Sequence, residues 1–193
     1  MAAPKAEQPV MFFATQAEFC DWLEAEHATS DGIWTKFAKK ASGITSLNYA
    51  EALDVALCFG WIDGQSKSLD ETYYLQRWTP RRKRSPWSKR NVDKVAKLIE
   101  DGLMQPAGQA EIDRARADGR WDRAYDGPRN ATVPDDLQAA LDANPNAAEF
   151  FATLTGNARY GILYRLQDAK KPETRQRRLE KFVGMLERGE KLR

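Results

Sequence analysis

Histidine and cysteine, which carry much of the nucleophilic and metal chemistry of proteins, are scarce in this chain. Its 193 residues include one histidine, His27, and two cysteines, Cys20 and Cys58. Their wide spacing matches no metal-ligand pattern, so we expect no structural metal. The sequence also contains no dinucleotide-binding glycine motif, phosphate-binding loop, zinc-protease motif or nucleophile elbow, and it therefore indicates no cofactor. These absences favour a protein that is not an enzyme, although carboxylate chemistry stays open.

Long hydrophobic runs are missing too, since no apolar stretch approaches the roughly 20 residues of a membrane-spanning helix. Residues 1–9 place no apolar stretch behind a basic start and so do not resemble a secretory signal. We therefore expect a disordered tail at 1–9, no membrane insertion and a cytoplasmic location. In that compartment Cys20 and Cys58, each among apolar neighbours, are expected to be reduced and buried.

The chain does contain clear signals for both strands and helices. Thr15 and Asn48, each followed three residues later by a glutamate, mark the starts of two helices. The second of these helices is apolar nearly all round, which indicates burial, and Gly60 ends it. We expect Leu57 and Trp61 to be core residues. The expected strands are 10–14, 32–39, 61–67 and 73–79, and the expected helices are 15–27, 49–59, 88–102, 106–119 and four more beyond 134.

Strands and helices come first in this order and helices alone follow, which favours an α+β fold. We expect a small, mainly antiparallel sheet packed with helices over residues 10–126. A stretch rich in Gly, Pro and Asn at 127–134 is the expected linker. Residues 135–193 are then expected to form a helical C-terminal region packed on the α+β core.

Positive charge is concentrated in one segment. Residues 77–97 hold nine basic side chains and one acidic one, whereas residues 1–76 hold five basic and eleven acidic ones. Arginine clusters and helix N-termini favour phosphates, and basic residues interleaved with tryptophans also fit single-stranded nucleic acid. The alternative is a solvated loop that pairs with the acidic N-terminal region. The candidate anion-binding residues are Arg77, Arg81, Arg82, Arg84, Trp87, Ser88, Lys89 and Asn91.

A second basic segment near the C-terminus adds Arg175 and Arg178, which fall three residues apart on one side of a helix. Glu173 and Glu180 are interleaved with them, so a salt-bridged surface is the alternative. Binding of nucleic acid by either segment is expected to be weak.

A candidate pocket is suggested by Asp63, which follows a buried helix in a strand. If the strand alternates, Asp63 shares a face with Trp61, and a carboxylate beside an indole is a candidate acid. The alternative is an Asp-Gly turn residue that bonds the local backbone. The candidate pocket residues are Trp34, Lys36, Tyr49, Glu51, Trp61 and Asp63.

Six sequence strings stand in order between about residues 10 and 190. They are WTK at 34–36, YAEALDVALCFGWIDG at 49–64, PR at 80–81, WSKRN at 87–91, GRWDRAY at 119–125 and AKKPETR at 169–175. Together they resemble the YdeI/OmpD-associated family of bacterial proteins. The resemblance implies a fold related to the YjbR/CyaY-like folds, association with an outer-membrane porin, and protection against bacteriocins or cationic antimicrobial peptides. It brings neither a reaction nor a cofactor.

Two hypotheses follow for the function. The first is a non-enzymatic cytoplasmic binding or stress-protection protein whose basic loop, residues 77–91, engages an anionic partner. The second is a small-molecule binder or enzyme that uses the six candidate pocket residues together. The two differ in whether those six side chains converge on one concave surface.

Overall fold

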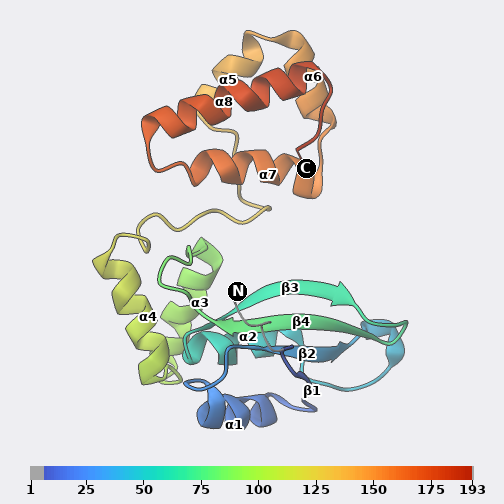
Figure 1. Cartoon of the computed structure of the whole chain (residues 1–193), viewed down its shortest axis with the longest axis vertical. Coiled ribbons are helices and arrows are strands. Elements are labelled where there is room, and N and C mark those ends of the chain that lie inside the picture. Colours follow the sequence, from blue (N-terminus) through green and yellow to red (C-terminus); the bar gives the residue numbers. More distant parts are fainter. Residues whose placement is uncertain (1–6, 193) are drawn as a thin grey trace, which may run out of the picture. The chain divides into compact units, whose positions relative to one another are not determined.

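The structure is a computed structural model and describes residues 7–192. Within this range the chain forms a four-stranded sheet and eight α-helices, which confirms the expected α+β class. It divides into two compact units (Figure 1). The sheet unit comprises the chain up to Trp87 together with Asn91–Arg123, and the helical unit comprises Ser88–Arg90 together with the chain from Ala124 onward.

The predicted domain organisation stays a prediction, beside which the structure gives two observations. Residues 1–6 of the expected tail lie outside the described residues, whereas the side chain of Gln8 donates a hydrogen bond to the Asp31 carbonyl at 2.7 Å. The expected linker at 127–134 lies inside the helical unit. That residues 135–193 pack on the α+β core stays a prediction.

The sheet unit contains all four strands and, apart from the first two residues of α3, the first four α-helices, close to the expected ranges. Its strands form in the order β1-β2-β4-β3 (Figure 1). β1 runs parallel to β2 and the other pairs are antiparallel, which confirms the mainly antiparallel sheet. The elements are β1 Val10–Phe12, α1 Gln16–Glu26, β2 Ile33–Ala38, a 3₁₀ turn Lys40–Ser42, α2 Tyr49–Cys58, β3 Trp61–Ser68, β4 Tyr73–Pro80, α3 Lys89–Glu100 and α4 Pro106–Ala117.

The two predicted helix starts are present. The Asn48 side chain accepts hydrogen bonds from the backbone of Ala50 and Glu51, while Glu51 accepts one from the Asn48 backbone, so the predicted capping box of α2 is complete. At the start of α1 the Thr15 hydroxyl accepts a hydrogen bond of 3.2 Å from the Glu18 backbone N–H. In a complete capping box the Glu18 carboxylate would accept a hydrogen bond from the Thr15 N–H. It accepts one from the Ala14 N–H instead, one residue earlier.

The end of α2 depends on glycine. Gly60 has φ +73°, and a Cβ atom there would lie 2.9 Å from the carbonyl oxygen of Ala107 in α4. Both the left-handed backbone and this close approach exclude a larger residue without strain. The chain can therefore turn directly from the buried helix into β3.

The core of the sheet unit lies on one face of the sheet, beneath α1 and α2. The side chains of Ile33, Thr35 and Phe37 point to this face and are almost completely buried, which confirms the predicted alternation of β2. Phe19 of α1 lies 6.0 Å from the Trp78 ring of β4. The two predicted core residues, Leu57 and Trp61, are each 1% exposed.

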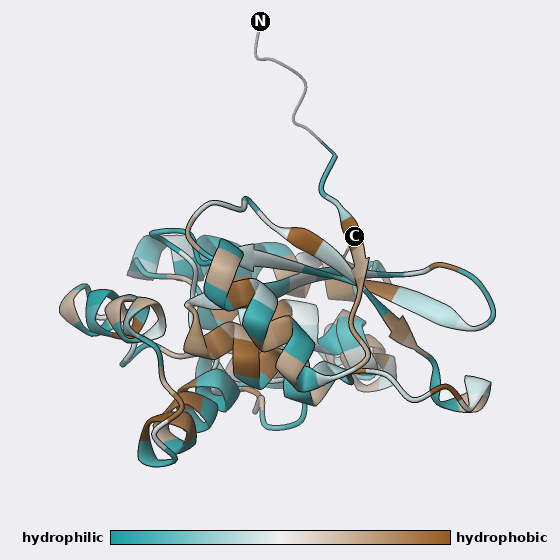
Figure 2. Ribbon diagram, turned by 90° about the horizontal axis from the view of Figure 1, so that it is seen from below, coloured by the Kyte–Doolittle hydropathy of each residue, from teal (hydrophilic) through white to brown (hydrophobic). Residues whose placement is uncertain are grey.

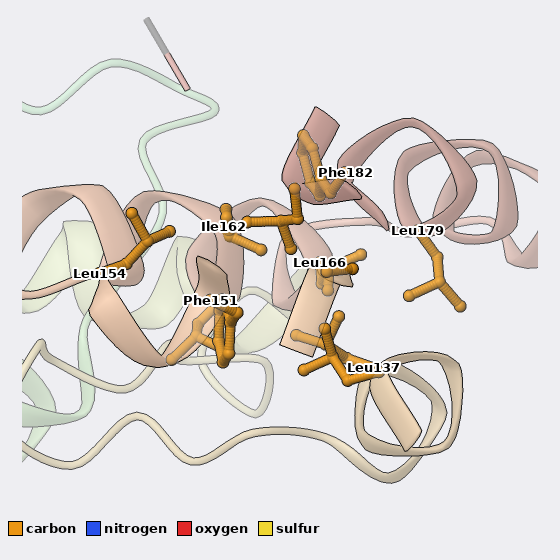
Figure 3. Close-up of a cluster of buried hydrophobic side chains, with 11 residues drawn as sticks. Leu137, Phe151, Leu154, Ile162, Leu166, Leu179 and Phe182 are labelled. Carbon is orange, nitrogen blue, oxygen red and sulfur yellow. The ribbon is translucent and has the colours of Figure 1, made fainter. Parts of the chain in front are cut away.

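The helical unit has a separate core. Its helices are α5 Asp135–Asp142, α6 Pro145–Thr153, α7 Gly156–Gln167 and α8 Pro172–Glu187. In Figure 2, hydrophobic residues alternate with hydrophilic ones along the α-helices of the chain, as expected for helices that bury one face. Figure 3 shows the buried cluster, in which Phe151 of α6, Leu166 of α7 and Phe182 of α8 are among the members.

Candidate functional site

The predicted basic loop divides into a buried part and an exposed part. The Arg81 guanidinium lies 3.7 Å from the centroid of the Trp87 ring and donates a hydrogen bond to the Pro86 carbonyl. Arg81 is 5% exposed and Trp87 only 1%. Trp87 therefore offers no ring face to a ligand, and this pair belongs to the core of the sheet unit.

The start of α3 is likewise not an open anion site. Ser88 and Asn91 are 8% and 7% exposed. Lys89 is exposed but forms an ion pair with Asp126 at 2.9 Å, and its hydrogen bond holds the pKa of the Asp126 carboxyl below its usual value. These three candidates therefore have structural surroundings within the chain.

The exposed part is a short turn at Arg82, Lys83 and Arg84, which we call the basic turn. Hydrogen bonds between the Arg82 backbone and both the hydroxyl and the N–H of Ser85 close it. The guanidinium of Arg120 donates to the Ser85 carbonyl at 2.8 Å and so anchors the turn to the segment after α4. The basic turn presents three adjacent positive charges on a fixed backbone.

The two C-terminal candidate arginines make structural contacts inside the helical unit. Arg175 of α8 forms two hydrogen bonds of 2.7 Å with the carboxylate of Asp136 in α5 and a third with the Leu166 carbonyl. The bonds from Arg175 lower the pKa of Asp136. Arg178 donates to the Arg165 carbonyl and lies 3.7 Å from Asp168. These arginines connect α8 to α5 and to the end of α7.

The six candidate pocket residues do not converge on one concave surface. Tyr49 and Asp63 do meet, because the Tyr49 hydroxyl donates to the Asp63 carboxylate at 3.0 Å. Glu51 is held in the capping box. Trp61 is buried, and its indole N–H donates to the His27 carbonyl. The remaining two, Trp34 and Lys36, lie on the opposite face of the sheet.

That opposite face brings three predicted residues together. Trp34 and Lys36 alternate with the buried side chains of β2, and the register pairs Trp34 with Arg77 of β4. By the same registers, neighbouring strands add side chains that the sequence reasoning missed. We call this surface the open face; its side chains are Val10, Phe12, Trp34, Lys36, Lys67, Tyr73, Leu75 and Arg77.

The open face interleaves cations with aromatic rings. The Lys36 ammonium lies 3.8 Å from the centroid of the Tyr73 ring, and the Lys67 ammonium lies 4.6 Å from the Trp34 ring. The Arg77 guanidinium donates to the Gln8 side chain at 2.6 Å. None of the eight side chains is acidic. A signal for this surface was present in the sequence, since residues on one side of the four predicted strands carry its rings and cations.

A cavity of about 560 Å³ lies elsewhere in the sheet unit, between α1, α2 and the α3–α4 connection. It is lined by Cys20, Cys58, Val55, Phe59 and Leu103, among others. Both thiols are free; Cys58 is buried, whereas Cys20 is partly exposed. Burial, followed by the charge of Asp54, raises the pKa of the Cys58 thiol to about 12. The sequence predicted two separate buried cysteines and missed the cavity that they share.

Metal and membrane sites have no candidate in the described chain. No three His, Cys, Asp or Glu side chains within residues 7–192 form a group that could hold a metal ion. Across the same residues, no helix combines the length and hydropathy needed to span a bilayer.

Residues 11–111, just over half of the chain, match the family model described as a domain of unknown function (DUF8412). The chain belongs to this family. The DUF8412 match runs from β1 into α4, so this domain carries the basic turn, the cavity and all of the open face except Val10.

A second match covers residues 130–189 and has the description "Bacteriocin-protection, YdeI or OmpD-Associated". It confirms the predicted resemblance to YdeI/OmpD-associated proteins, over the helical region that follows the DUF8412 domain. Of the six strings that carried the resemblance, only AKKPETR at 169–175 lies within this match. The expected relation to YjbR/CyaY-like folds has no support, and no curated protein and no solved structure matches the chain.

Proposed function

We propose that this protein is a non-enzymatic binding protein that holds an anionic polymer on its open face. The observation that carries the proposal is the grouping of Lys36, Lys67 and Arg77 on one sheet face with no acidic neighbour among its side chains. A polymer that bridges several cations releases its counterions on binding, which favours association at low salt.

The basic turn supports this function in a secondary way. Arg82, Lys83 and Arg84 are exposed and add positive charge shortly after β4 ends. The turn has no available ring, because Trp87 is buried. We therefore assign it long-range attraction of the polymer rather than direct contact.

The proposal is tested with the full chain and inorganic polyphosphate at low salt. Binding should be measurable by fluorescence anisotropy and should fall linearly, on logarithmic axes, as salt rises. The variant with Lys36→Gln, Lys67→Gln and Arg77→Gln keeps most of the aliphatic stems and should lose this binding. A chain that binds neither polyphosphate nor any oligonucleotide at low salt would contradict the proposal.

The cellular role that we propose is protection against bacteriocins or cationic antimicrobial peptides, exerted in the cytoplasm. Its support is the description of the family that residues 130–189 match. Cells without the gene should survive exposure to such a peptide less well, and the wild-type chain should restore survival while the triple Gln variant should not. We do not extend the proposal to porin binding, because a mature outer-membrane porin is not in the cytoplasm.

A second candidate function is the binding of a small, largely apolar molecule in the cavity beside Cys20 and Cys58. Its volume, about 560 Å³, falls within the usual range of ligand pockets. Native mass spectrometry of the chain purified from its own cells should then reveal a bound compound. Val55→Phe, which fills the cavity, should abolish the added mass, and retention of the mass would place the compound elsewhere.

A further inference from the structure

The open face presents aromatic rings from three strands. Phe12 of β1 is 46% exposed, while Trp34 of β2 and Tyr73 of β4 are partly exposed. The rings of Phe12 and Tyr73 are 6.3 Å apart and meet edge to face. Trp34 pairs with Arg77 and Tyr73 with Ala38, which separates the Trp34 and Tyr73 positions by four residues, or about 13 Å, along the ladder. The face therefore has two distinct ring positions.

These rings are not part of the core of the sheet unit. The core side chains of β2 and β4, such as Phe37 and Trp78, lie on the other face beneath α1 and α2. A single exposed ring needs no explanation, but three on one face form a patch of the kind that binds a partner. Leu75, which is only 3% exposed, lies on the open face between the Lys36 and Lys67 positions and closes its floor.

The cations of the open face stand where a polymer backbone can reach them. The ammonium groups of Lys36 and Lys67 lie over the Tyr73 and Trp34 rings. Each sits on a flexible four-carbon stem, so it can move from the ring to a nearby phosphate when a flat group takes its place. Arg77 is held more firmly, by its bond to Gln8. Rings and cations therefore alternate across the same strands.

Only one class of anionic polymer uses both kinds of group. Polyphosphate has charge but nothing to stack, and a duplex keeps its bases paired inside. An unpaired strand offers bases to aromatic rings and phosphates to lysine and arginine, and four-stranded sheets with aromatic faces bind two or three bases in this way.

We propose that the open face binds single-stranded nucleic acid, with bases stacked on Phe12, Trp34 and Tyr73 and phosphates held by Lys36, Lys67 and Arg77. The inference rests on the proposed function and identifies the anionic polymer of that function.

The test compares strands of equal charge with and without bases. The full chain is titrated at low salt with a labelled oligothymidylate of about 12 nucleotides, within the usual site size, and with an abasic strand of the same length. The thymidylate should bind about tenfold more tightly or better. A matching duplex and inorganic polyphosphate should follow the abasic strand.

Substitutions of the aromatic residues test whether the preference for a strand with bases arises at the open face. Phe12→Ala and Trp34→Ala should each reduce the ratio of thymidylate to abasic affinity by about fivefold or more, and Trp34→Phe should restore much of it. Ile99→Ala is the matched control, because Ile99 is 40% exposed in α3, and the variant should leave the ratio unchanged. If a thermal melt shows that Trp34→Ala disturbs folding, the Phe12→Ala variant still tests the inference, because Phe12 is exposed on a short edge strand.

The outcomes separate the inference from the proposed function. Equal binding of the thymidylate and abasic strands would overturn the stacking inference and leave polymer binding intact. A Phe12→Ala variant with the full preference would also overturn it. If no strand and no polyphosphate binds, the proposed function fails together with the inference.

Discussion

The arginines of the helical unit and the lysines of the open face look alike in the sequence but have different surroundings in the structure. Arg175 and Arg178 bond to carboxylates and to the carbonyls at the end of α7. Lys36 and Lys67 lie over aromatic rings, and neither forms an ion pair within residues 7–192. A basic residue whose charge is already paired stabilises the fold, whereas one without a carboxylate partner can exchange its contact for a ligand.

The cores of the two units differ in a related way. The sheet unit buries large rings such as Trp61, Trp78 and Phe19 on one face and leaves the other open. The helical unit buries mainly leucine side chains at the centre of four helices. Binding by flat stacking requires a surface of the first kind, because a helical bundle directs its rings inward.

The largest expected effect concerns the core of the sheet unit. Leu57→Ala removes a side chain that is 1% exposed in α2, and it should lower the free energy of unfolding by about 2–5 kcal/mol. Denaturant titration followed by tryptophan fluorescence measures this. A loss below about 1 kcal/mol would show that α2 does not form the centre of this core.

Removing one positive charge from each unit tests the comparison between them. Arg175→Ala breaks the bonds from α8 to Asp136 and Leu166, and it should lower stability by about 1–2 kcal/mol. Lys67→Ala should leave the melting temperature nearly unchanged and weaken polyanion binding. The opposite pattern would mean that the paired and unpaired cations have been assigned the wrong way round.

The ion pair of the helical unit should also give a dependence on pH. Because Arg175 lowers the pKa of Asp136, the folded state holds the carboxylate form more strongly than the unfolded chain does. The resulting stability is present above about pH 4, the usual aspartate value, and is lost as the pH falls through the lower folded value. Thermal melts between pH 6 and pH 2 should show that Asp136→Asn loses less stability on acidification than the wild type does.

A smaller effect is expected at the buried thiol of the sheet unit. Burial keeps Cys58 protonated up to a pKa of about 12, whereas an unfolded cysteine loses its proton near pH 8.5. The unfolded state is therefore favoured as the pH rises above about 9, and Cys58→Ser should reduce this alkaline loss. At neutral pH iodoacetamide should modify the partly exposed Cys20 first, and faster modification of Cys58 would contradict its burial.

Much of the fold was predictable because its signals are local. The capping residues Thr15 and Asn48, the helix-ending Gly60 and the alternation of β2 each act within a few residues. The candidate site depends on the strand registers, which are set by contacts across the sheet. For this reason the sequence predicts one pocket for Trp34, Lys36 and Asp63, although the pleat directs Asp63 to the opposite face from Trp34 and Lys36.

The basic loop shows why charge density alone does not identify the candidate site. Its sequence alternates arginines with two tryptophans, but the guanidinium of Arg81 packs on Trp87 and both are buried. Composition cannot distinguish a tryptophan that stacks on an internal arginine from one that is available to a ligand. The open face was harder to see, because Phe12, Trp34, Lys67 and Tyr73 come from four separate strands.

The salt dependence of single-strand binding tests most directly whether the open face makes the contacts with the polymer. Three phosphate contacts at Lys36, Lys67 and Arg77 contribute about 2 to the slope of log affinity against log salt on a single strand. The triple Gln variant at these positions should lose that amount. A matched triple variant of the basic turn, with Arg82→Gln, Lys83→Gln and Arg84→Gln, should keep most of the wild-type slope. A full slope in the open-face variant, with a reduced slope in the basic-turn variant, would contradict the assignment and place the contacts at the turn.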